Sequence, residues 1–146
     1  MRRDLHSKLM VATAIAAAVL SATPTALEVD TQGYSSIELV LSVGAGGITF
    51  DDTNKVEFKV EHSDDGSDWS DVVADDILGQ ETVTTGIVKA LTAVHASAGS
   101  YRFGYIGPKR YVRVTPVFSG THGSPTPLAG TWLLSNAAIQ PVADQA

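Results

Sequence analysis

The chain of 146 residues contains no cysteine. Disulfide bridges, thiolate metal sites and a cysteine nucleophile are therefore excluded, and the composition is consistent with folding in a reducing cytoplasm. Hydrophobic residues make up 44% of the chain. This fraction is enough to build a hydrophobic core without disulfide bridges, and the length suits one domain.

Positive charge is also scarce, because 10 lysines and arginines face 16 acidic residues and give a net charge of −6. An acidic surface repels phosphate, so we expect no nucleic-acid partner. The apolar run from Leu9 to Leu20 is too short to cross a bilayer as a helix. We therefore expect no membrane partner either.

The start of the chain has the outline of a secretory signal peptide. A basic Met1-Arg2-Arg3 precedes the apolar run, and small residues follow it at positions 21–23. Asp4 and His6 dilute the basic region, so we expect the segment to be retained.

A retained segment must bury its apolar side chains within the protein or against a neighbour. Val11, Ile15 and Val19 lie at odd positions, which favours an extended chain, although the alanines between them also permit a helix. We therefore expect residues 1–25 to form an N-terminal arm or a first strand.

Residues 26–146 contain short alternating or β-branched segments separated by turn residues. The stretch Val56 to Glu61 alternates strictly, which is typical of a half-buried strand, and Ser63 to Asp68 follows it with turn residues. Glycine, serine, threonine and proline at 120–127 predict an exposed loop. The further expected strands are 26–30, 37–43, 69–73, 82–91, 101–105, 111–117 and 131–134. This pattern predicts an all-β fold, a β-sandwich or jelly roll in one domain over residues 26–146.

Residue patterns for catalysis are weak. The histidines His6, His62, His95 and His122 lack the spacing of metal pairs, and we expect them at the surface. No serine lies in a G-x-S-x-G elbow, and no glycine-rich phosphate loop opens a helix. We therefore expect no enzyme, no cofactor, no metal and no catalytic residue.

Two further features have competing interpretations. The acidic run Asp64, Asp65, Asp68 and Asp71 could hold calcium, but it falls where a hairpin turn is expected and lacks EF-hand spacing. We favour turn chemistry. Trp69 and Trp132 could contact a sugar or a partner, and we favour a place in the core for both.

A first resemblance rests on the segment Val60 to Trp69, which contains Ser-Asp-Asp-Gly before a tryptophan, and on Arg110-Tyr111-Val112-Arg113. These stretches resemble core strands of discoidin-type, galactose-binding-like domains. The resemblance implies a jelly-roll construction and covers about a fifth of the chain. Sugar binding in such domains belongs to loops that these residues do not reach.

A second resemblance covers most of the chain. It rests on the turn from Asp30 to Ser36, the glycine-ended strand from Ile37 to Gly47, the segment Ala74 to Gly79, and Gly104 to Val114. In this order they are similar to small virion proteins that tailed phages and prophages encode beside the major capsid protein.

This second resemblance implies a virion structural protein, made in the host cytoplasm and located on the capsid exterior. We expect a capsid decoration (cement) protein that binds the major capsid protein and self-associates, as a trimer. The alternatives are a carbohydrate-binding module and a phage tail structural protein. The residues expected to contact the shell or a sister subunit are Leu9, Val11, Ile15, Val19, Lys109 and Arg110.

Overall fold

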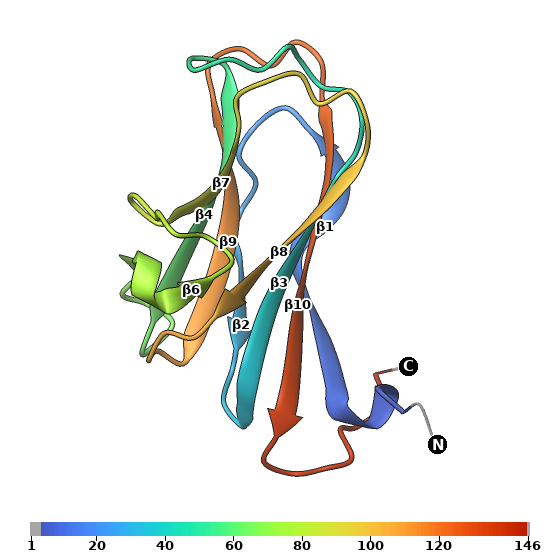
Figure 1. Cartoon of the computed structure of the whole chain (residues 1–146), viewed down its shortest axis with the longest axis vertical. Coiled ribbons are helices and arrows are strands. Elements are labelled where there is room, and N and C mark those ends of the chain that lie inside the picture. Colours follow the sequence, from blue (N-terminus) through green and yellow to red (C-terminus); the bar gives the residue numbers. More distant parts are fainter. Residues whose placement is uncertain (1–3, 146) are drawn as a thin grey trace.

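The computed structural model describes residues 4–145 and shows two antiparallel sheets packed face to face as a β-sandwich (Figure 1). Sheet A has the strand order β1-β10-β3-β8-β6, and sheet B has the order β2-β9-β4-β5, with β7 also paired to β4. The strands are β1 (Leu9–Leu20), β2 (Leu27–Asp30), β3 (Tyr34–Val43), β4 (Lys55–Ser63), β5 (Ser70–Asp71), β6 (Ile77–Leu78), β7 (Ile87–Leu91), β8 (Gly99–Tyr105), β9 (Tyr111–Ser119) and β10 (Thr126–Ala137).

Helix is confined, within residues 4–145, to two short 3-10 turns, η1 (His6–Lys8) and η2 (Ala74–Asp76). Neither turn approaches the length or apolarity that a membrane-crossing helix requires. The all-β prediction and the β-sandwich are confirmed.

The core lies between the sheets because alternate side chains of each strand point inward. In β4, Val56, Phe58 and Val60 are fully buried, and in β10 Leu128, Trp132 and Leu134 are buried on the facing sheet. The sequence periodicity predicted the inward face of β4 correctly.

The N-terminal segment is a first strand and not a free arm. β1 pairs antiparallel with β10 from Leu9 opposite Ser135 to Leu20 opposite Thr126 and forms one edge of sheet A. Ala14 and Ile15 from its middle belong to the hydrophobic core. The chain itself therefore covers the middle of the apolar run, whereas Val11 and Val19 stay exposed.

Two predicted strands are shorter than expected. The segment 69–73 contributes only β5, and the segment 82–91 forms a strand only at β7. Thr85 and Gly86 have positive φ and make a tight turn, which separates residues 82–84 from the strand despite their β-branched side chains. The predicted loop 120–127 ends at Thr126, where β10 begins.

Candidate functional site: the outer face of sheet A

The outer face of sheet A consists of the side chains that point away from the core. Register places Val11, Leu133 and Glu38 side by side across β1, β10 and β3, and Thr13, Thr131 and Val40 likewise. The full set is Leu9, Val11, Thr13, Val19, Ser36, Glu38, Val40, Ser42, Leu78, Ser100, Arg102, Gly104, Pro127, Ala129, Thr131, Leu133 and Ser135. Only Glu38 and Arg102 in this set are charged, and their closest oxygen and nitrogen atoms lie 3.8 Å apart.

The outer face of sheet B has the opposite character. Alternating charges run along β4, where Lys55 pairs with Glu57 at 2.8 Å and Lys59 pairs with Asp71 at 2.8 Å. Arg113 of β9 donates to Glu61 at 2.8 Å. One sheet therefore presents an ion-paired surface typical of contact with water, while the other presents apolar and hydroxyl side chains.

A groove extends this apolar face around one end of the sandwich. A hollow of about 470 Å³ on sheet A has a largely apolar floor that includes Leu9, Leu78 and Leu133. A second hollow of about 440 Å³ at the turn between β8 and β9 shares Ser35, Ile37, Tyr105 and Ile106 with the first. The second hollow is bordered by Lys109 and Arg110. The groove thus joins three of the six residues expected to make contacts.

The free edge of β1 is protected against strand-to-strand pairing. The register shifts between Thr13 and Ile15 and again between Ile15 and Ala18, and such irregularities bend an edge away from a flat template. The C-terminal tail covers the beginning of the same edge, where the side-chain amide of Gln145 accepts from Val11 N at 2.9 Å and donates to Val11 O at 2.7 Å. Contact through the sheet face is therefore more consistent with this construction than contact through the edge.

The six expected contact residues are not equivalent in the structure. Val11 and Val19 are 43% and 63% exposed on the outer face of sheet A, and Leu9 lies half-buried beside them. Ile15 was expected to contact a shell or sister subunit, and this is wrong, because it is 4% exposed and packs in the chain's own core. Its neighbour across the strands is Gly130, whose lack of a side chain leaves the space that Ile15 fills.

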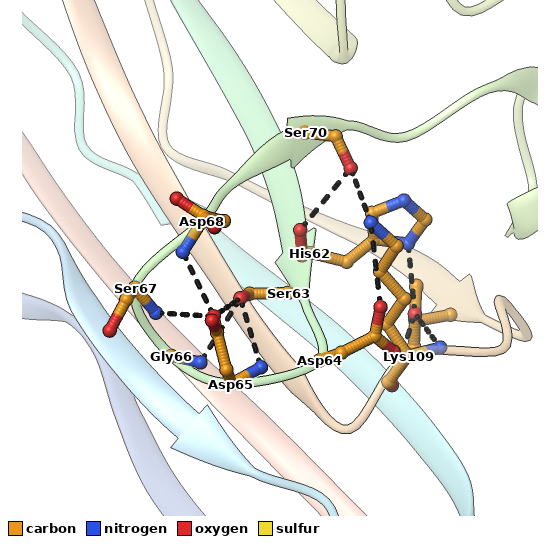
Figure 2. A network of polar contacts seen from close by, with 10 residues as sticks. His62, Ser63, Asp64, Asp65, Gly66, Ser67, Asp68, Ser70 and Lys109 are labelled. Atoms are coloured by element: carbon orange, nitrogen blue, oxygen red, sulfur yellow. Dashed lines mark hydrogen bonds and ion pairs between the residues drawn. The ribbon is translucent and has the colours of Figure 1, made fainter.

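Lys109 and Arg110 lie away from the apolar strands, at the turn before β9. The Arg110 guanidinium donates two hydrogen bonds to Asp30, at 2.8 and 2.6 Å, and this partner lowers the pKa of the Asp30 carboxyl. Lys109 Nζ donates to Ser70 Oγ at 2.7 Å and lies 3.9 Å from Asp64 (Figure 2). Both cations therefore have partners within the chain.

The acidic run forms a turn, as favoured. Figure 2 shows the Asp65 carboxylate at the centre of the loop, where it accepts the backbone N–H groups of Ser67 at 2.8 Å and Asp68 at 2.9 Å and the Ser63 hydroxyl at 2.9 Å. These donors lower the pKa of Asp65 to about 2. Within residues 4–145, no group of three histidine or acidic side chains is arranged to hold a metal ion.

His62 was expected at the surface, and this is wrong because it is buried at the end of β4. Its Nδ1 lies 3.0 Å from the Tyr105 hydroxyl, which also accepts Lys109 N–H and lies within hydrogen-bond distance of Lys109 O. The hydroxyl has one proton, which it donates either to the Lys109 carbonyl or to Nδ1 of His62, and this choice sets the tautomer of His62. Burial lowers the pKa of His62 and raises that of Tyr105 to about 12.

The two tryptophans have different environments. Trp132 lies in the core as predicted. Trp69 is half-buried on the outer side of sheet B, where the guanidinium carbon of Arg113 lies 4.2 Å from its ring centroid, so its predicted core position is wrong.

Comparisons of the chain with known protein families, with curated proteins and with solved structures find no match. Function is therefore inferred from the two sheet faces, the groove and the segments that resemble small phage proteins.

Proposed function

We propose that this protein is a structural subunit that docks through the outer face of sheet A onto another protein of an assembly. We further propose that this assembly is the head of a tailed phage and that the chain is a capsid decoration protein on the major capsid protein, because the chain resembles small phage proteins that are encoded beside the capsid protein. The observation that carries the proposal is the contrast between the apolar face of sheet A and the ion-paired face of sheet B.

The size of the face suits a specific contact. Five strands about 4.8 Å apart, each rising about 3.4 Å per residue, give a flat footprint of roughly 700 Å². Side-chain relief and the groove add to this area, and a standard interface uses about 800 Å² of accessible surface per partner. Many copies on a shell would strengthen individually weak contacts through multivalency.

The alternatives have less support. A sugar-binding surface uses an open aromatic face, and Arg113 covers one face of Trp69. A tail structural protein would use the same apolar face, but it would form rings or tubes when purified.

The test is co-expression of the chain with the major capsid protein encoded in the same genome, followed by separation of particles on a density gradient. Val19→Lys places a charge on the outer face of sheet A, and Val94→Lys is the matched control in the loop after β7. The two valines are 63% and 62% exposed, so both variants should fold equally well.

We expect Val19→Lys to weaken binding to particles at least about tenfold, equivalent to about 1.4 kcal/mol, because a lysine must be desolvated at the contact. Val94→Lys should bind like the original chain. Equal binding by both variants would exclude the outer face of sheet A as the docking surface.

A further inference from the structure

Lys89 is a cation that points toward the inside of the sandwich. It lies opposite Phe58 in the pairing of β7 with β4, and residues directly opposite on antiparallel strands project to the same face. Phe58 is fully buried, so Lys89 is directed toward the open side between the sheets. Its Nζ lies 3.8 Å from the ring centroid of Tyr101 in β8, on the facing sheet.

Lys89 differs from the other half-buried cations. Lys55, Lys59, Lys109 and Arg113 each have a carboxylate within 4.0 Å. In the part of the chain that the structure describes, Lys89 is the only half-buried lysine or arginine with no such partner. Burial accordingly lowers the pKa of its ammonium group. The Tyr101 ring is a weak cation–π partner for this ammonium, whereas partly desolvated charges in proteins are normally paired with an opposite charge, so the missing carboxylate suggests a ligand.

The surroundings of Lys89 supply space and further donors. A hollow of about 550 Å³ lies between β7 and the edge of β8 and is lined in part by Lys89, Gln80, Ser100 and Arg102. Its lining residues include no carboxylate. The Arg102 side chain is 83% exposed, and its 3.8 Å separation from Glu38 is too long for a hydrogen bond, so its N–H groups remain available.

We propose that this hollow is a binding site for a carboxylate group. Lys89 supplies a partly desolvated positive charge, and Arg102 supplies the planar fork of N–H donors that matches a carboxylate. We choose a carboxylate over phosphate because phosphate sites commonly use clustered backbone N–H groups at loops or helix N-termini, whereas strands β7 and β8 supply most of the lining of this hollow. The hollow adjoins the outer face of sheet A, because Ser100 and Arg102 belong to both, but carboxylate binding does not depend on the apolar contact proposed above.

The direct test is an NMR titration of the protein with sodium acetate at constant ionic strength, using chloride as the balancing anion. We expect saturable shifts at the backbone amides of Lys89, Ser100 and Arg102. Lys89→Met should weaken acetate binding at least tenfold. Lys8→Met is the control, because Lys8 is exposed and, within residues 4–145, also has no carboxylate within 4.0 Å; it should leave binding unchanged.

Three results would overturn the proposal: no saturable shift, an unchanged titration in Lys89→Met, or tighter binding of inorganic phosphate than of acetate. Thermal unfolding gives an independent readout. Lys89→Met should melt at or above the temperature of the original chain, because removing a desolvated ammonium without a carboxylate partner offsets the loss of its cation–π contact with Tyr101. A melting temperature several degrees lower would mean that the ammonium is already satisfied within the chain.

Binding of the two variants to particles then identifies the source of the carboxylate. If Lys89→Met binds particles less tightly than Lys8→Met, the group is an acidic side chain of a neighbouring subunit. If both variants bind particles equally and acetate still binds the free protein, the ligand is a small carboxylate from solution.

Discussion

At the scale of single residues, burial and hydrogen bonds set the protonation states of two side chains, His62 and Asp65. His62 is neutral because it is buried against Tyr105, and Asp65 is ionised because three donors surround its carboxylate. The turn at Asp65 could be predicted from its residue types. The inward position of His62 continues the alternation of Val56, Phe58 and Val60 and was missed, whereas its contact with Tyr105, 43 residues further along the chain, could not be predicted.

The lowered pKa of His62 makes stability depend on mildly acidic pH. The unfolded chain binds a proton near pH 6.5, whereas the folded chain binds it only at lower pH, so the free energy of unfolding should fall as pH drops below 6.5. Urea denaturation from pH 7.5 to 5 should show this fall. His62→Gln should flatten it, and an equally steep fall in the variant would contradict the assignment.

Asp65 should act at lower pH. Its folded pKa of about 2 lies below the unfolded value of 3.8, so its stabilising contribution is present above pH 3.8 and is lost as pH falls toward 2. Asp65→Asn keeps an acceptor oxygen but has no titrating group. Between pH 4.5 and 2, the melting temperature should therefore fall less steeply for the variant than for the original chain.

At the scale of elements, β1 was the hardest segment to predict from the sequence. Alternation favoured an extended conformation. The strand that pairs with it, β10, lies more than a hundred residues away in the chain, and the sequence pattern does not identify it. The two register shifts place Ala14 and Ile15 together in the core, which simple alternation does not anticipate. A free arm and an edge strand share the same sequence pattern.

Ile15 and Val19 test the role of β1 as part of the sandwich. Ile15→Ala should lower the free energy of unfolding by about 2–5 kcal/mol, because it leaves a cavity in the core. Val19→Ala should change it by less than about 0.5 kcal/mol, because Val19 is largely exposed. Urea denaturation measures both values, and a neutral Ile15→Ala would mean that β1 detaches readily from the sheet.

At the scale of the whole molecule, the two sheets have different outer surfaces: the outer face of sheet A is largely apolar, and that of sheet B is charged. Sequence periodicity predicted the all-β class and most of the strands but not β6, and the charged alternation of β4 is visible in the sequence itself. The apolar outer face of sheet A was not predicted, because it arises when β1, β10, β3 and β8 align in one register. Leu133 and Val40, for example, become part of a continuous apolar surface only because β1 places Val11 and Thr13 beside them.

The absence of cysteine allows a direct measurement of which face is covered in the assembly. Thr131→Cys places one thiol at the middle of the outer face of sheet A, and Thr115→Cys places one at a similarly half-buried position on the outer face of sheet B. Maleimide labelling is measured for each variant, free and bound to particles. We predict that binding slows labelling of Thr131→Cys at least about tenfold and leaves Thr115→Cys unchanged, in line with burial of a standard interface. Protection of Thr115→Cys with Thr131→Cys still reactive would contradict the account.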